Sequence, residues 1–248
     1  MKKYGGNEVT NNFQIKYGEN LIEQNKKYFY KIFKLKKNST IKVPKFCHGT
    51  IFIKSVKKTT LIFNKKKIKV RDGFSLEFKN YINFEIECEF AIFFLVGLVK
   101  KNMDKRFVKK TIYHQHYKVK KPWGYELWIN GQKPTYAFKE IFLKKGNQTS
   151  LQYHNRKRET NFLYEGKATL IYKKNKNIKN NDVKNNDLAS INIKNISIIN
   201  VKPKDLHRIK ALTDIKLYET STPDLDDVIR IMDDTKREDG RIQYEHKE

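Results

Sequence analysis

Four side chains that can bind a metal ion occur close together in the second half of the chain. Gln152, His154 and Glu159 share one segment, and His207 follows a turn at Pro203. Because residues two apart on a strand face the same side, we expect Gln152 and His154 to point together. Imidazoles, a carboxylate and an amide oxygen suit a divalent ion with coordination positions left open. These four residues are therefore predicted to bind one divalent ion, with zinc as the first choice and iron, manganese or cobalt as alternatives.

Each of these residues also has an ordinary role when it is taken alone. A single histidine such as His154 or His207 more often makes a hydrogen bond on the surface or in the core, and Glu159 alone would be a solvated charge in a turn. Their joint occurrence at these spacings favours the metal site. The pair His114 and His116 also has metal-like spacing, but no carboxylate lies nearby in the sequence, so we expect this pair to be exposed.

The elements that position these side chains are predicted to be strands. Short runs of β-branched and aromatic residues recur along the chain between turn formers, and long amphipathic helical patterns do not occur. This pattern of many closely spaced short strands is typical of a sandwich or a barrel, so the predicted fold class is all-β. The predicted strands are 28–35, 50–56, 59–63, 68–70, 74–78, 84–88, 91–96, 125–129, 138–143, 150–153, 160–164, 168–172, 196–201 and 216–220.

Changes in composition predict two tandem β-barrels. Residues 1–100 form the first, in which His48 is the only histidine, so we interpret it as a structural or dimerisation domain without a metal. The polar, basic residues 101–120 are predicted to be a linker or an exchanged edge segment. Residues 121–237 form the metal-binding barrel. Within it the polar stretch 173–194 is expected to be a mobile hairpin tip or a loop that is too polar to pack a core, and residues 238–248 a frayed, charged tail.

The second barrel resembles the two motifs of cupins, and more narrowly the cupin domain of type II mannose-6-phosphate isomerases. The resemblance covers about residues 118–237 and implies a bicupin whose first barrel is degenerate. Gln152 stands where most metal cupins have histidine, as it also does in this isomerase group. Lys204 departs from the pattern, because a turn glycine is usual there. The segments that carry the resemblance are Lys121-Pro-Trp-Gly-Tyr-Glu126, Lys139, Ser150-Leu-Gln-Tyr-His154, Glu159, Pro203 to Arg208, and the acidic tail 221–234.

The resemblance implies an aldose–ketose isomerase that acts on a sugar phosphate. In such an enzyme the metal polarises the carbonyl and hydroxyl oxygens of the open-chain sugar, while a base moves a proton between neighbouring carbons. Glu126 and Glu140 are candidates for this base, which the sequence does not identify. The residues expected to bind the phosphate are Lys139, Arg208, Arg156 and Arg158.

Two other classes of function are compatible with the sequence. A non-catalytic cupin module that binds a sugar or a nucleotide-sugar would look much the same. The formal net charge of +26 suggests nucleic-acid binding as another function. However, most of the basic residues are lysines spread along the whole chain rather than clustered arginines. The predicted partner is therefore a small-molecule sugar phosphate, and nucleic acid ranks last.

The remaining sequence features indicate a cytoplasmic protein without a membrane partner. The N-terminus lacks the apolar core of a signal peptide, and the most apolar segment, 91–99, is too short to span a bilayer. Cys47 and Cys88 are too few for a disulfide framework. A homodimer remains an open alternative to a monomer.

Overall fold

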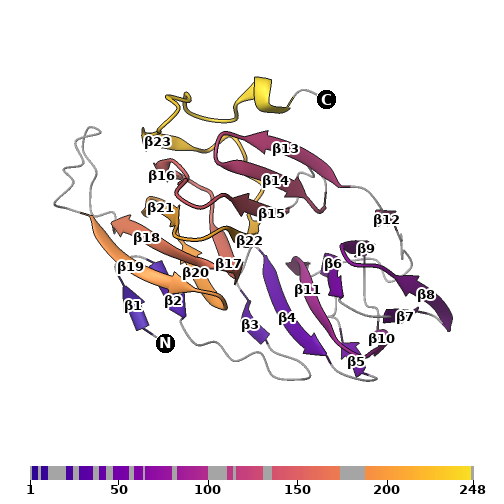
Figure 1. Cartoon of the computed structure of the whole chain (residues 1–248). Coiled ribbons are helices and arrows are strands. Elements are labelled where there is room, and N and C mark those ends of the chain that lie inside the picture. Colours follow the sequence, from indigo (N-terminus) through magenta and orange to yellow (C-terminus); the bar gives the residue numbers. More distant parts are fainter. Residues whose placement is uncertain are drawn as a thin grey trace. The chain divides into compact units, whose positions relative to one another are not determined.

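The computed structural model of the chain consists almost entirely of strands (Figure 1). It describes residues 2–4, 7–10, 21–24, 28–35, 39–42, 47–55, 59–63, 65–79, 83–99, 111–113, 116–130, 136–173 and 188–246. Within these residues the helical element is the short 3-10 helix η2 (Gln243–His246). The predicted all-β fold class is confirmed, and every predicted strand overlaps an observed one.

The chain divides into two compact units. The C-terminal unit comprises Met1–Phe13, Tyr117–Trp128 and Gln132–Glu248, and the N-terminal unit comprises Gln14–His116 and Ile129–Gly131. The first strands of the chain therefore group with its C-terminal part. The domain boundaries at residues 100 and 121 stay predictions.

The C-terminal unit contains two antiparallel sheets that share one core. Buried side chains from both sheets meet there, including Leu143 and Leu217 from the larger sheet and Leu170 and Ala211 from the smaller one. The larger sheet has the order β1 (Lys2–Tyr4), β2 (Asn7–Thr10), β20 (Ser197–Val201), β17 (Glu159–Glu165), β22 (Ile215–Ser221), β15 (Ala137–Leu143), β14 (Gly124–Trp128), β13 (Tyr117–Lys121). The smaller sheet has the order β19 (Ala189–Lys194), β18 (Lys167–Lys173), β21 (Leu206–Ala211), β16 (Leu151–Tyr153), β23 (Ile229–Met232).

Part of the stretch that was expected to be a loop is a strand. Residues 174–187 lie outside the described residues, but Ala189–Lys194 forms β19 and pairs with β18 along its whole length. The reason is the alternation of Ile191 and Ile193 with polar residues, which places both isoleucines against the core. The prediction of a hairpin tip or loop too polar to pack a core was therefore wrong for residues 189–194, which form one strand of the hairpin.

The N-terminal unit repeats the arrangement of two antiparallel sheets around an apolar core. Its buried cluster includes Ile51, Leu61, Phe78 and Phe93. One sheet has the order β12 (Thr111–Tyr113), β9 (Phe74–Lys79), β6 (Cys47–Ser55), β11 (Ala91–Val99), β4 (Phe29–Leu35), β3 (Leu21–Gln24). The other has the order β5 (Ser39–Lys42), β10 (Asn83–Cys88), β7 (Thr59–Phe63), β8 (Lys66–Val70).

The C-terminal tail is folded rather than frayed. The side chain of Ile242 is buried, with a relative exposure of 7%. Lys121 Nζ donates to Glu245 Oε2 at 2.6 Å, which ties η2 to the end of β13. In Figure 1 this segment, in yellow, runs from β23 to the C-terminus. The prediction of a frayed tail was wrong because Lys121, which pairs with Glu245, lies far away in the sequence.

None of the described residues belongs to a helix long and apolar enough to cross a membrane.

Candidate metal centre

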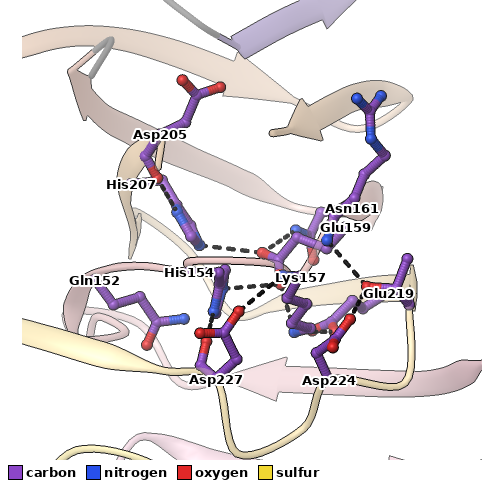
Figure 2. Close-up of polar contacts among 12 residues, drawn as sticks. Gln152, His154, Lys157, Glu159, Asn161, Asp205, His207, Glu219, Asp224 and Asp227 are labelled. Atoms are coloured by element: carbon purple, nitrogen blue, oxygen red, sulfur yellow. Dashed lines mark hydrogen bonds and ion pairs between the residues drawn. The ribbon is translucent and has the colours of Figure 1, made fainter. Parts of the chain in front are cut away.

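Three side chains of the C-terminal unit converge on one point. His154 follows β16, Glu159 begins β17 and His207 lies on β21, and donor atoms of all three lie within 4.8 Å of one another. His154 Nε2 is 3.4 Å from Glu159 Oε2, and His207 Nε2 is 3.1 Å from Glu159 Oε1. All three side chains are buried. Figure 2 shows both imidazoles directed toward the carboxylate.

Backbone carbonyls fix the orientation of both imidazoles. His154 Nδ1 donates to the carbonyl of Asp227, and His207 Nδ1 donates to the carbonyl of Asp205 at 3.1 Å. Because a carbonyl can only accept, each Nδ1 carries hydrogen, and in the neutral ring each Nε2 has a free lone pair. Metal-binding histidines are commonly held in this way by an acceptor on the far nitrogen.

Electrostatic interactions within the cluster favour an ionised carboxylate. Burial acts to raise the pKa of Glu159, but Lys157 and His207 outweigh it and hold this pKa well below its ordinary value. Burial lowers the pKa of His154, which keeps its ring neutral. Burial also acts to lower the pKa of His207, but the charge of Glu159 outweighs it and raises that pKa. The cluster thus offers a carboxylate together with one neutral imidazole and one that carries a proton more readily.

The residues present fit a divalent ion. His154 Nε2 is buried and has no hydrogen-bond partner among the described residues, an arrangement that costs about 1–3 kcal/mol unless something else binds the nitrogen. Two imidazole nitrogens and one carboxylate form a donor set typical of zinc and non-haem iron sites that keep positions open. His154, Glu159 and His207 would therefore hold such an ion.

Gln152 lies beside this cluster. It is directly opposite His207 in the pairing of β16 with β21, and it lines the same cavity. Its amide oxygen accepts a hydrogen bond from Ser150 Oγ at 2.6 Å. In this orientation the amide oxygen is engaged by Ser150. A rotation of the amide group by a half-turn would exchange the positions of its oxygen and nitrogen, so Gln152 stays the proposed fourth ligand.

Of the second histidine pair, His116 belongs to the N-terminal unit. Its Nε2 lies 3.0 Å from the carbonyl oxygen of Gly73, and its ring meets that of Phe52 edge-on. His114 lies outside the described side chains. His116 is thus partly buried and hydrogen-bonded, so the expectation of an exposed side chain was wrong for this histidine. It belongs to a different unit from the cluster of His154, Glu159 and His207.

A buried lysine outside the set of predicted site residues lies within the site. Lys157 Nζ donates to Glu159 Oε2 at 2.6 Å and to Glu219 Oε1 at 2.8 Å. Glu219 is also 3.2 Å from Lys139 Nζ, which donates to Glu126 at 2.9 Å. The result is a continuous row of alternating charges that leads away from the cluster. Figure 2 shows its first part, from Glu159 through Lys157 to Glu219.

Asp227 is a second site residue that the sequence did not predict. It holds the turn between His154 and Glu159. Its carboxylate accepts the backbone N–H groups of Asn155, Arg156 and Lys157, and its carbonyl orients His154. Burial acts to raise the pKa of Asp227, but these backbone donors outweigh it and lower the pKa. One residue therefore fixes both His154 and the following turn.

The cluster opens into a cavity of about 110 Å³ within the C-terminal unit. Gln152, Glu159 and His207 line it, together with the apolar side chains of Trp123, Ile141 and others. Charged residues make up much of the remaining wall. These are Lys121, Glu126, Lys139, Lys157, Glu219, Arg230, Arg237 and Arg241.

The structure brings one of the four predicted phosphate-binding residues to this cavity, namely Lys139. Arg156 is exposed and lies 3.3 Å from Asp224, and Arg158 meets Thr222 through its backbone. Arg208 donates to the carbonyl of Met232 at 2.8 Å. Being next to His207 on a strand, it faces the opposite side of β21. Phosphate binding by these four residues stays a prediction, which a complex with substrate would test.

The two candidates for the general base differ in position. Glu126 lines the cavity, whereas Glu140 accepts the hydroxyl hydrogens of Tyr125 at 3.0 Å and Tyr218 at 2.7 Å and is not part of the lining. Burial acts to raise the pKa of Glu126, but Lys139 and Lys121 outweigh it and lower this pKa to about 2. A carboxylate of that pKa is ionised at neutral pH but accepts a proton poorly.

The depressed pKa of Glu126 predicts a specific loss of stability in acid. A carboxylate whose pKa is about 2 when folded and 4.5 as the reference stabilises the fold above pH 4.5, and this contribution disappears as the pH falls toward 2. Its full size is about 3 kcal/mol. Urea unfolding of the metal-free Glu126→Gln variant should therefore differ from wild type most at pH 7 and least near pH 2. Glu85→Gln, at an exposed position, serves as the control. A difference independent of pH would contradict the assignment.

Comparisons with known proteins agree with this architecture. A sequence model of the family described as "Mannose-6-phosphate isomerase C-terminal" matches residues 108–233. The protein Ylba from E. coli is similar in structure, with a TM-score of 0.65, 9% identity, and coverage of 90% of this chain and 93% of that one. Oxalate decarboxylase from Lactobacillus farciminis gives a TM-score of 0.61, 10% identity, and coverage of 93% and 89%.

A third similar structure is that of HEPD from Streptomyces albus, described with its substrate 2-hydroxyethylphosphonate and Fe(II) bound. Its TM-score is 0.62 at 6% identity, with coverage of 88% of this chain and 76% of that one. No curated protein matches the chain by sequence. At these identities the structural likenesses establish the cupin fold alone, while the family match spans half of the chain. The chain therefore belongs to the mannose-6-phosphate isomerase C-terminal family of cupin-fold proteins.

Proposed function

We propose that this protein is a metal-dependent sugar-phosphate isomerase of the mannose-6-phosphate isomerase type, which interconverts an aldose phosphate and a ketose phosphate. The observation that carries the proposal is the cluster of His154, Glu159 and His207, of which Glu159 and His207 line a cavity with several buried cations, in a chain of this family. Adjacent oxygens of an open-chain sugar suit open metal positions, and a phosphate suits the cations.

The residues of the site have distinct parts in this proposal. A divalent ion held by the cluster, with Gln152 as the fourth ligand, would polarise the carbonyl and neighbouring hydroxyl of the sugar. Asp227 keeps the Nε2 atom of His154 directed at the site. Lys157 neutralises the buried Glu159 and Glu219. Apolar residues such as Trp123 exclude water around the sugar.

A second candidate function is a non-catalytic module that binds a sugar or nucleotide-sugar. The observation that favours it is that each carboxylate of the cavity wall is already bound to lysine. Glu126 binds Lys139, Glu159 binds Lys157, and Glu219 contacts both lysines. The pKa values of Glu126 and Glu159 are lowered by these lysines, so neither carboxylate is well suited to carry a proton between carbons.

Turnover distinguishes the two functions. Purified protein loaded in turn with zinc, iron, manganese or cobalt should interconvert mannose 6-phosphate and fructose 6-phosphate with at least one of these ions. Activity should disappear on chelation and return when the ion is restored. In D2O, nuclear magnetic resonance should detect exchange of hydrogen at the carbons next to the carbonyl.

Two results would decide against the isomerase. Binding of sugar phosphates without turnover or hydrogen exchange would favour the binding module. Turnover that persists after complete metal removal would contradict the metal-dependent mechanism.

A further inference from the structure

The C-terminal segment supplies one wall of the cavity. Gly240, Arg241, Ile242 and His246 line it, and Arg230 and Arg237 lie just before them in the chain. Besides the bond from Lys121 to Glu245, Arg237 lies 3.5 Å from Glu245. These two ion pairs therefore hold the segment in place through Arg237 and Glu245.

Most of the cavity's cations already have carboxylate partners. Lys139 and Lys157 each contact two glutamates, as described above. Lys121 lies 2.6 Å from Glu245 and 3.8 Å from Glu126. Arg237 lies 2.6 Å from Asp233 as well as contacting Glu245. The charges of these four side chains are thus compensated before any ligand binds.

Arg230 differs from these four cations. Its Nη1 donates to the backbone carbonyls of Glu238 and Gly240, and it forms no ion pair with a carboxylate among the described residues. Its Nε is buried and has no hydrogen-bond partner within the described chain. Burial, followed by repulsion from Arg237, lowers the pKa of Arg230, although Asp233, Glu245 and Asp239 act in the opposite direction. Carboxylates thus lie near this guanidinium, but among the described residues none of them is paired with it.

The position of Arg230 relates it to the metal cluster. It pairs with Gln152 across β23 and β16, and Gln152 pairs with His207 across β16 and β21. Neighbouring strands lie about 4.8 Å apart, so the backbone of Arg230 is about two strand spacings from that of His207. The backbone N–H of Arg230 donates to Asp239 at 2.7 Å, which fixes its place on the strand. A ligand that reaches both sites must carry its anionic group several bonds away from its metal-binding oxygens.

We propose that Arg230 is the anion-binding residue of this cavity and that it binds the phosphate monoester of the substrate, while the carbonyl end of the sugar faces His154, Glu159 and His207. This assignment rests on the proposed function for the identity of the substrate. The guanidinium offers Nε and Nη2 in the fork that matches two phosphate oxygens. The carbonyls of Glu238 and Gly240 hold the remaining nitrogen and pre-orient the fork.

Binding, measured separately from turnover, tests the assignment. Calorimetry on the metal-loaded protein would use mannose 6-phosphate, inorganic phosphate and uncharged mannose as probes. Wild type should bind both phosphates more tightly than mannose. Arg230→Gln should bind both phosphates about 10- to 100-fold more weakly, since a charge-assisted bidentate contact is lost, and should keep its affinity for the metal. Arg230→Lys should recover part of the affinity. Arg71→Gln, at an exposed arginine of the N-terminal unit, should bind as wild type.

The outcomes separate this inference from the proposed function. Phosphate binding that depends on Arg230 in a protein without isomerase activity would support the anion site and contradict the isomerase. A folded Arg230→Gln protein with wild-type phosphate affinity, or a wild type that binds no phosphate, would overturn the anion site. If Arg230→Gln does not fold, mass spectrometry after phenylglyoxal treatment of wild type decides. Phosphate should protect Arg230 from modification, and equal modification with and without phosphate would overturn the inference.

Discussion

The double variant His154→Ala, His207→Ala is expected to lose its divalent ion completely at concentrations that saturate the wild type. The two imidazoles provide two of the three donors that converge within 4.8 Å, and one carboxylate cannot hold the ion alone. Loss of an outer partner of a ligand already costs about 10- to 100-fold in affinity, so loss of two ligands should cost more than about 1,000-fold. Metal analysis after dialysis and calorimetric titration would measure this loss.

Thermal unfolding separates loss of the site from loss of the fold. An ion present at 100 times its Kd stabilises the folded state by about 2.7 kcal/mol. The ion should therefore raise the Tm of wild type and leave that of the double variant unchanged, while the two metal-free proteins remain folded. His116→Ala should retain the ion, because this histidine lies in the N-terminal unit. Full metal retention in the double variant would refute the ligand assignment.

The sequence predicted those features of the site that depend on local spacing. His154 and Glu159 are separated by one short turn, and His207 follows a recognisable proline turn, so their approach required only the assumption of a barrel. The same local reasoning explains the strands, since alternation of apolar residues determines which face is buried. It also explains the placement of Arg208, whose position next to His207 puts it on the other face of β21.

Features that depend on pairing between distant strands could not be read in this way. Glu219 lies opposite Lys139 in one strand pair and opposite Asn161 in another, and only this register brings it to Lys157. Lys157 stands two residues before Glu159, but lysine is rarely buried, so its spacing alone did not indicate a place inside the protein. The burial of Lys157 can be understood only once the positions of Glu159 and Glu219, the two carboxylates that neutralise it, are known.

Replacing Lys157 is expected to destabilise the fold strongly. In Lys157→Met the side chain keeps a similar length, but Glu159 and Glu219 lose a cation that lies 2.6 Å and 2.8 Å away. Removing one partner of a buried ion pair typically costs about 3–5 kcal/mol, because the remaining charge is left uncompensated. Urea unfolding of the metal-free protein at pH 7 should show a loss of this size. Lys144→Met, at an exposed lysine, should change the free energy of unfolding by less than about 0.5 kcal/mol.

The cause of this destabilisation can be isolated with a second substitution. Lys157→Met, Glu219→Gln removes one of the two carboxylates that have lost Lys157, although Glu219 keeps its contact with Lys139 at 3.2 Å. The second substitution should therefore recover part of the lost stability, an interaction that a double-mutant cycle measures. Binding of the divalent ion should recover more, because the ion supplies positive charge to Glu159. The affinity of Lys157→Met for the ion should exceed that of wild type, since a cation no longer competes for the same carboxylate oxygen. A variant that loses stability and metal affinity together would show instead that Lys157 acts by holding Glu159 in its binding geometry.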